Sequence, residues 1–313
     1  MNKVLVLGAS GGMGYALVNE LTSRGIETIA FSRTRQKLER LFEGNGLVTV
    51  YNGDVFQKSE LIKAAEQVTI IYHAINIPYS EWEEKHPIIM GNIVDTAKRQ
   101  NTKLAIVDNI YAYGRGNGET VKEEFPKRPH TKKGKIRLKL ENMAKQSGVP
   151  VLFAHFPDFY GPNAENTQIH YMLQSVVKNK RSMFVGDQKI AREYIFTPDG
   201  AKALVELSLR DDAYNQNWNI PGFGVITGKD IVQIVKEITG YRKKVSTATK
   251  NMIRFMGLFD KGMREFVEML YLNENPVVLN GGKYEKIIGP VPRTSYEEGL
   301  RQTLEFMNAR HHP

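Results

Sequence analysis

The chain has 313 residues with a net charge of +9, 41% hydrophobic and 25% charged residues, and no cysteine, which excludes disulfides, thiolate metal centres and a thiol nucleophile. No run of about 18 apolar residues could span a membrane, and the start of the chain lacks the apolar segment of a signal peptide. We therefore expect a cytoplasmic protein with no membrane partner, long enough for one large α/β domain and a smaller lobe.

The first half of the chain alternates short apolar runs with segments of helical periodicity. Strands are predicted at 3–7, 28–31, 47–51, 68–72, 103–107 and 151–154. Helices are predicted between them at 12–24, 35–42, 59–65, 86–99 and 134–146. Ser59 is the expected N-cap of the third helix. Six strands with helices between them indicate a Rossmann-type, doubly wound parallel sheet, which we assign to residues 1–160 as the dinucleotide-binding domain.

A glycine-rich segment, GASGGMG at 8–14, joins the first predicted strand to the first predicted helix. Glycines spaced by three permit a tight turn, close approach of the backbone to a diphosphate, and close packing of helix on strand. The N–H groups at the start of the helix would then face the negative charge. The residues expected to hold the dinucleotide here are Gly8, Ser10, Gly11, Gly12, Met13 and Gly14.

The choice between NAD and NADP is read at the end of the second strand, where an acid would bind the ribose 2′-hydroxyl. This chain has Ser32 and Arg33 there and no acid. Arg33 can pair with a 2′-phosphate and Ser32 can donate a hydrogen bond to it, so we expect NADP rather than NAD; the alternative is that Arg33 is a solvated surface charge. Asp54 and Val55 follow the third strand, where they could border the adenine, although a turn role for Asp54 is nearly as consistent with the sequence.

A basic run carries most of the positive charge: seven Lys or Arg residues and no acid lie between Lys127 and Lys139. Such a patch suits an anionic small molecule as readily as nucleic acid. Because no aromatic residue interrupts it, a stacking platform for single strands is not expected, and nucleic acid is the less favoured partner.

After residue 160 the pattern loosens, and residues 161–313 are predicted to form a smaller C-terminal α/β lobe that binds substrate and is partly interleaved with the first domain. Helices are predicted at 169–178, 198–209, 229–239, 251–258 and 262–270, and short strands near 192–195 and 218–220. The Met and Phe residues between Met252 and Leu270 favour a helix pair that buries one face in this lobe or in a dimer contact. A membrane-surface helix or a cofactor helix is the alternative.

Six motifs follow one another in a specific order along the chain. They are Gly8xxGly11xxGly14, GDV at 53–55, HAIN at 73–76, YAYG at 111–114, PDFYGP at 157–162 and REYIFTPD at 192–199. With these motifs the chain resembles the extended short-chain dehydrogenase/reductases, the NAD-dependent epimerase/dehydratase family, over nearly its whole length. The resemblance implies a Rossmann domain that holds the dinucleotide, with His73, Ala74 and Pro157 lining it, and a second lobe that holds substrate.

The catalytic positions depart from the family pattern, which has a Ser or Thr five residues before the glycine of the Tyr-Gly pair and Tyr-x-x-x-Lys on the following helix. In this chain those places are taken by Asn109, Lys133 and Arg137, as in atypical members that lack the tyrosine. Lys133 and Arg137 lie four residues apart on one helical face, so the guanidinium and burial would favour a neutral Lys133 that transfers a proton. Arg137 would bind ribose hydroxyls, and Asn109 would polarise a substrate oxygen.

Several alternatives to this catalytic set are open. Lys133 could be a solvated cation of the basic run, with catalysis lost or moved. Tyr111 or Tyr113 could take over the phenol role, although Tyr113 suits packing at the turn better. His130 and His73 could also move protons, although His73 suits a cofactor-lining or core position better. No histidine–carboxylate spacing indicates a metal site.

Three residues are candidates for contacts to substrate. Asp158 and Tyr160 follow the sixth strand, at the carboxyl edge where open α/β sheets bind ligands. In the family layout Arg192 can reach a substrate phosphate. The alternative is a structural pairing of Arg192 with Glu193 or Asp199.

These features together predict an NAD(P)-dependent oxidoreductase, epimerase or dehydratase that acts on a carbonyl or carbinol substrate. A nucleotide sugar is one candidate substrate and a small carbonyl compound is another. A catalytically silent NADP-binding redox sensor or scaffold is the main alternative, motivated by the missing tyrosine. A homodimer is expected from base rates alone.

Overall fold

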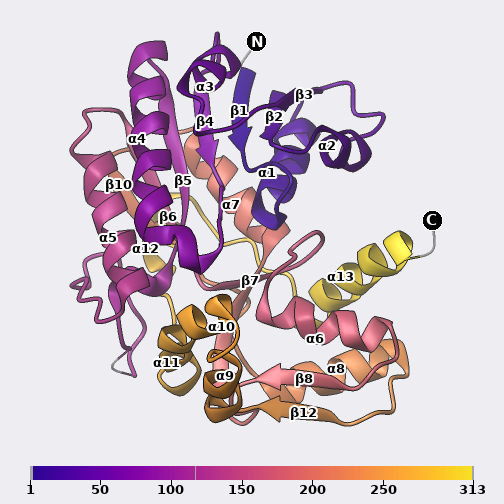
Figure 1. The fold of residues 1–313 in the computed structure, drawn as a ribbon. Coiled ribbons are helices and arrows are strands. Elements are labelled where there is room, and N and C mark those ends of the chain that lie inside the picture. Colours follow the sequence, from indigo (N-terminus) through magenta and orange to yellow (C-terminus); the bar gives the residue numbers. More distant parts are fainter. Residues whose placement is uncertain (1–2, 117, 312–313) are drawn as a thin grey trace.

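The central feature of the computed structural model, which describes residues 3–116 and 118–311, is a seven-stranded parallel sheet (Figure 1). Its order is β10-β6-β5-β4-β1-β2-β3, which contains the 3-2-1-4-5-6 arrangement of doubly wound dinucleotide-binding sheets. The predicted fold class is therefore confirmed. The strands are β1 (Lys3–Leu7), β2 (Glu27–Ser32), β3 (Val48–Asn52), β4 (Ile70–His73), β5 (Lys103–Asn109), β6 (Val151–Phe156) and β10 (Gln216–Asn219).

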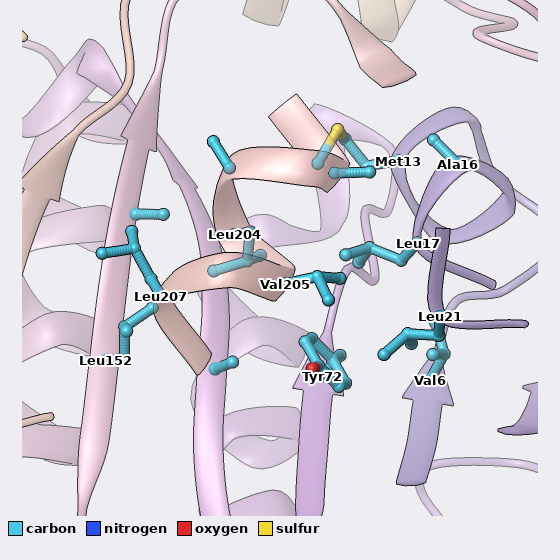
Figure 2. Packing of buried hydrophobic residues seen from close by; sticks show 14 of the residues in the cluster. Val6, Met13, Ala16, Leu17, Leu21, Tyr72, Leu152, Leu204, Val205 and Leu207 are labelled. Atoms are coloured by element: carbon cyan, nitrogen blue, oxygen red, sulfur yellow. The ribbon is translucent and has the colours of Figure 1, made fainter. Parts of the chain in front are cut away.

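Helices cover both faces of this sheet, which explains why its strands are apolar on both sides. The helices packed on one face are α1 (Gly12–Ser23), α2 (Arg35–Leu41) and α7 (Thr197–Ser208). The helices packed on the other face are α3 (Lys58–Ala64), α4 (Trp82–Gln100) and α5 (Lys132–Lys145). Figure 2 shows Leu204 and Val205 of α7 beside Leu17 of α1 and next to Tyr72 of β4, in one buried cluster. Segments far apart in the sequence therefore share this core.

A second lobe lies below the carboxyl edge of the sheet in Figure 1. It contains a three-stranded sheet in the order β11-β9-β7 and a parallel strand pair, β12-β8. Its strands are β7 (Asp158–Tyr160), β8 (Ser182–Val185), β9 (Ala191–Phe196), β11 (Val225–Thr227) and β12 (Val245–Ala248). The remaining α-helices are α6 (Gln168–Val177), α8 (Gly228–Thr239), α9 (Lys250–Met256), α10 (Lys261–Phe266), α11 (Tyr271–Glu274), α12 (Gly282–Ile287) and α13 (Tyr296–His311). The 3-10 turns are η1 (Tyr79–Glu81), η2 (Ile110–Tyr113), η3 (Asp211–Ala213) and η4 (Val267–Leu270).

Most helix starts lie one to four residues before the predicted ones, and two of these differences have a clear local cause. Helix α3 begins at Lys58 with Gln57 as its N-cap, so Ser59 is not the cap. The reason is a preceding turn in which the N–H of Gln57 bonds to the carbonyl of Asp54 (2.9 Å) and starts the helix earlier. Helix α4 begins at Trp82, about one turn before the predicted start, because η1 leads directly into it.

The Met and Phe segment of the second lobe departs from its predicted burial. In α9, Ile253 is buried, whereas Met252 and Phe255 are 44% and 65% exposed. Leu258 and Phe259, which follow the helix, are also exposed. Within one chain, α9 therefore buries one apolar side chain in the lobe, and the predicted alternative of a dimer contact stays a prediction. These apolar residues are not part of a spanning segment, since no helix within 3–116 and 118–311 is long and apolar enough to cross a membrane.

Candidate active site

The glycine-rich segment after β1 forms a tight turn. Gly8 has a φ of +83°, a left-handed conformation that side chains disfavour, and a Cβ there would lie 2.8 Å from the carbonyl oxygen of Ala74. A Cβ on Gly14 would overlap the carbonyl oxygen of Gly8. Both glycines therefore allow α1 to start close to the ends of β1 and β4.

The N-terminus of α1 has the properties of an anion site. Gly11, at the N-cap, has no side chain to bond the first N–H groups, and the first turn contains no acid. The Nδ2 atom of Asn163 donates to the carbonyl of Ser10 (3.0 Å), which holds the loop after β7 against the turn. N–H groups that the helix cannot bond, together with the positive end of its dipole, fit the diphosphate of a dinucleotide.

The residues predicted to distinguish NADP from NAD lie at the end of β2. Arg33 is exposed, whereas Ser32 is buried and its Oγ accepts a hydrogen bond from the N–H of Thr34 (3.3 Å). Asp54 forms a local turn, because its Oδ1 accepts the backbone N–H two residues further on (3.1 Å), and Val55 is buried in the core beside α3. Arg33 is thus the side chain of this group that is open to solvent or to a ligand.

A buried cluster surrounds Arg137 of α5. Its guanidinium lies 4.4 Å from the centre of the Trp82 ring and 3.5 Å from the carboxylate of Asp108. Within the described residues, neither Arg137 Nε nor the ring nitrogens of buried His86 have a hydrogen-bond partner. Burial, with Arg137 as the next cause, lowers the pKa of His73 to about 3 and that of His86 to about 2, so both rings are neutral. Buried polar atoms without partners are rare, and ribose hydroxyls are groups that would satisfy them.

Lys133 is buried and ion-paired. Its Nζ contacts the carboxylates of Glu265 and, at 3.0 Å, Glu268, which come from α10 and η4 of the second lobe. Glu268 also accepts the backbone N–H groups of Lys132 (2.8 Å) and Lys133 (3.2 Å), and the Thr131 hydroxyl accepts another at the same helix end. The interpretation of Lys133 as a solvated cation is therefore wrong. The two carboxylates pair with the Lys133 side chain. The prediction of a neutral Lys133 considered only Arg137 and burial, and did not include these two acids.

Two tyrosines meet beside Lys133. The hydroxyls of Tyr79 and Tyr111 are 2.7 Å apart, and Lys133 Nζ lies 5.6 Å from the centre of the Tyr79 ring. Burial raises the pKa of Tyr79 to about 12 and that of Tyr111 well above its ordinary value, so both hydroxyls keep their protons at neutral pH. Asn109 Oδ1 accepts the N–H of Tyr111 (3.0 Å), so its Nδ2 is the end that can donate. Tyr113 is buried and its hydroxyl donates to an asparagine of β10 (2.8 Å), as expected for a packing role.

Two of the predicted substrate residues pair with each other. Arg192 of β9 is buried against Asp158 of β7, and its Nη1 donates to Gln168 Oε1 (3.1 Å). The alternative pairing of Arg192 with Glu193 or Asp199 is wrong, because both carboxylates accept backbone N–H groups instead. Asp158 and Arg192 line a cavity of about 10 Å³, which is room for about one water molecule.

Other predicted contact residues lie deeper in the protein. Tyr160 is 1% exposed and packs against the rings of Phe196 and Tyr296 in the core of the second lobe, so its side chain does not line a pocket. The Met13 side chain is buried in the core of the first lobe, which leaves its backbone N–H as the group that a ligand could meet. Pro157 is buried between β6 and β7.

The basic run at 127–139 does not form a continuous surface patch. Three of its cations, Lys127, Lys133 and Arg137, are largely buried beside carboxylates. Lys132 pairs with Glu83 of α4 (2.5 Å). Much of this charge is therefore used inside the protein, which weakens the argument for a polyanionic partner.

One group of side chains within residues 3–116 and 118–311 has the geometry of a metal site. Asp108, Glu141 and His155 are buried with their ligand atoms within 4.8 Å of one another. The ammonium of Lys127 contacts Glu141 and lies 2.9 Å from His155 Nε2. A positive charge is thus already present in this cluster.

Sequence reasoning missed several residues that complete the site. They are Tyr79, Trp82, His86, Glu265 and Glu268. The first three follow the HAIN motif, and their position after β4 is a signal that could have placed them at the same edge of the sheet. The two acids lie more than 130 residues from Lys133, and no local pattern indicates the pairing.

The match to known families covers the whole sheet. Residues 4–220 match the model of the NAD dependent epimerase/dehydratase family. A putative UDP-glucose 4-epimerase from Methanocaldococcus jannaschii is 22% identical over 97% of this chain and 98% of its own length. A trifunctional UDP-glucose 4,6-dehydratase/UDP-4-keto-6-deoxy-D-glucose 3,5-epimerase/UDP-4-keto-L-rhamnose-reductase from Arabidopsis thaliana is 25% identical over 51% of this chain, and the match spans 21% of that protein's length.

Solved structures share the fold. The UDP-glucose 4-epimerase of Thermotoga maritima with UDP-glucose superposes with a TM-score of 0.80 at 18% identity over 99% of both chains. The dTDP-glucose 4,6-dehydratase of Bacillus anthracis in complex with NAD gives a TM-score of 0.82 at 17% identity, over 99% of this chain and 98% of that one. Because such relatives hold NAD, the comparisons do not support the predicted preference for NADP. The matched residues include the glycine turn and cover more than half of the chain, which therefore belongs to the NAD dependent epimerase/dehydratase family.

Proposed function

We propose that the protein is an NAD(P)-dependent enzyme that exchanges hydride with a carbinol or carbonyl carbon of a nucleotide sugar. The observation that carries this proposal is the uncapped N-terminus of α1, at the edge of the sheet that also carries Tyr79, Tyr111 and Arg137. A bound nicotinamide would supply or accept the hydride, so the protein's task is to position the reactants and to move a proton. Relatives that act on UDP- and dTDP-sugars support the substrate class.

We assign proton transfer to Tyr111 rather than to Lys133. In the direction of reduction, the nicotinamide would supply the hydride and the Tyr111 hydroxyl would donate its proton to the substrate carbonyl oxygen. Tyr79 orients this hydroxyl through their 2.7 Å contact. Lys133 acts as a positioning residue, because its ammonium lies against the Tyr79 ring and is fixed by two carboxylates.

The remaining predicted residues have supporting roles in this proposal. Asn109 Nδ2 would donate to the same substrate oxygen, as an oxyanion donor does. Arg137 would hold ribose hydroxyls through its unpartnered Nε. The buried Arg192–Asp158 pair would lie on the side of the site where substrate binds. There Arg192 could bind a substrate phosphate in place of Asp158.

We further propose that the enzyme prefers NADP to NAD, and this preference rests on Arg33. Its side chain is exposed at the end of β2, where an acid would instead bind the ribose 2′-hydroxyl. Because the solved relatives hold NAD, both cofactors belong in every titration. We also expect a cytoplasmic location and, from base rates, a homodimer.

Titration calorimetry with NAD⁺, NADH, NADP⁺ and NADPH tests the cofactor site. Gly11→Ala places a Cβ 3.5 Å from the Gly8 carbonyl, which the fold tolerates, but it projects from the turn where a diphosphate must approach. We expect this variant to keep its melting temperature and to bind the dinucleotide about 10-fold more weakly or worse. Gly46→Ala, at an exposed glycine with open space around it, is the matched control and should bind as the wild type does. No heat with any of the four cofactors would refute the proposal.

A catalytically silent dinucleotide-binding protein is the second candidate. The observation that favours it is Lys133 at the position of the family's tyrosine, ion-paired with Glu265 and Glu268. Turnover of a panel of UDP- and dTDP-sugars, followed by cofactor absorbance and by product chromatography, separates the two. Tight cofactor binding without turnover of any member would favour the silent protein.

A further inference from the structure

Five large apolar side chains are exposed within a stretch of eight residues in the second lobe. We name them the α9 patch: Met252, Phe255, Met256, Leu258 and Phe259, which are 44% to 81% exposed. The rings of Phe255 and Phe259 meet edge to face with centroids 5.6 Å apart, so the patch includes a joined aromatic surface. In Figure 1, α9 lies beyond α10, at the end of the lobe away from the central sheet. Clustered apolar exposure marks a docking surface, whereas single exposed apolar residues do not.

Cations accompany the α9 patch. Arg254, Lys261 and Arg264 are all exposed, and they lie within or directly after the patch in the sequence. The acid between them, Asp260, caps α10, because its Oδ1 accepts the N–H of Met263 in the first turn of that helix (2.7 Å). The surface therefore combines bulky apolar groups with a positive charge.

The charge of this surface favours an anionic occupant over a second copy of the chain. A two-fold dimer through the α9 patch would set the patch against itself. Six cations, Arg254, Lys261 and Arg264 of each copy, would then lie in or beside one contact, and like charges brought together in this way oppose association. Anionic lipid headgroups, in contrast, attract such cations while aromatic and aliphatic side chains enter the boundary between headgroups and acyl chains.

We propose that the α9 patch docks the protein peripherally on an anionic lipid surface. Docking of this kind needs no spanning helix, so it is compatible with the helices described above and replaces the expectation that no membrane takes part. The same segment continues into α10 and η4, which bring Glu265 and Glu268 to Lys133. Docking would therefore place this wall of the candidate active site close to the bilayer.

Sedimentation of the full-length protein with vesicles tests the proposal. Vesicles of phosphatidylcholine alone are compared with vesicles of phosphatidylcholine mixed with phosphatidylserine. One variant, F255S/F259S, removes the aromatic part of the patch, and R254Q/K261Q/R264Q removes the positive charge. The matched controls are F223S, at a phenylalanine 52% exposed outside the patch, and K135Q/K139Q/K286Q, at three exposed lysines elsewhere.

We expect the wild type and both controls to bind the mixed vesicles and to bind phosphatidylcholine vesicles far more weakly. F255S/F259S should bind at least about 10-fold more weakly, and R254Q/K261Q/R264Q roughly 100-fold more weakly, with melting temperatures unchanged. Failure of the wild type to bind the mixed vesicles would overturn the proposal, as would wild-type binding by F255S/F259S. Analytical ultracentrifugation adds a further arm: a wild-type dimer that F255S/F259S converts to a monomer would make the patch a contact between copies and would also overturn it.

Discussion

Lys133 stands where the family pattern has a tyrosine, and its environment explains how a cation can be accommodated there. Its side chain is almost fully buried, and burying an unpaired ammonium would cost several kcal/mol. Glu265 and Glu268 compensate that charge, and the hydrogen bond from Lys133 lowers the pKa of Glu265. The result is a fixed positive charge beside Tyr79, whose hydroxyl contacts that of Tyr111. Because Lys133 is held in these ion pairs, we assign proton transfer to Tyr111 instead.

Tyr111→Phe is the substitution that tests this assignment. We expect kcat for the best nucleotide-sugar substrate to fall by about 100-fold or more, because the proton donor is lost while the ring is kept. The dinucleotide Kd should stay unchanged in calorimetry. Tyr113→Phe is the matched control: its hydroxyl donates to Asn219 inside the protein, so it should lose about 1 kcal/mol of stability and keep its kcat. A Tyr111→Phe enzyme as fast as the wild type would return the proton-transfer role to Lys133.

Residues whose role depends on local backbone geometry could be predicted from the sequence, and residues whose role depends on distant partners could not. Gly8 and Gly14 could be predicted because their spacing marks the turn, and the structure shows that a Cβ at either position would clash with the backbone. Lys133 was singled out from the family pattern, but its ion pairs with Glu265 and Glu268 come from another lobe. Ion pairs between residues more than 130 positions apart produce no periodic pattern in the sequence, so they could not be predicted from it.

At the scale of elements, α5 shows how one helix start depends on both lobes. Its first turn contains Lys132 and Lys133 and no acid, so its N-terminal N–H groups and dipole need partners from outside the helix. Thr131 supplies one through its Oγ1, which accepts the N–H of Gly134 (3.0 Å), and Glu268 supplies the others. The position of Lys133 and Arg137 relative to the sheet therefore depends on this cap.

Thr131→Ala should reduce the free energy of unfolding by about 1 kcal/mol, because it leaves a buried N–H of α5 without its acceptor. Thr131→Ser keeps the hydroxyl and should recover most of that loss. Chemical denaturation of the three proteins, with the slope of each transition compared, measures the difference. Equal stabilities of the Ala and Ser variants would show that the hydroxyl does not cap the helix.

The strength of the sequence signal also varied among the elements. The inner strands of the parallel sheet are buried on both faces, and their apolar runs made them easy to predict. The edge strand β3 is only partly buried and was predicted from a shorter signal. The short strands β7, β8, β11 and β12 were not predicted, because three or four residues carry too little periodicity to be separated from a loop. Helix α13 was also missed.

At the scale of the whole molecule, the two halves of the chain share one core. Strand β10 pairs with β6 in register Trp218 to Ala154, which extends the central sheet with residues from beyond position 160. Helix α7 packs on α1, with Leu204 and Val205 in the same cluster as Leu17 (Figure 2). The division at residue 160 stays a prediction, and this packing gives it a testable consequence.

A fragment of residues 1–160 should not fold by itself. It would leave one face of the sheet without α7 and the β6 edge without β10, so apolar side chains and strand N–H groups that are buried in the full chain would meet water. We expect the fragment to lack a cooperative thermal transition and to bind the dye ANS strongly, as loosely packed states do. Co-expression with residues 161–313 is the control, because it restores α7 and β10 in trans and should restore a cooperative transition. A fragment 1–160 that melts cooperatively and binds a dinucleotide would instead show that the first lobe is an independent domain, with α7 and β10 as additions to a core that is already complete.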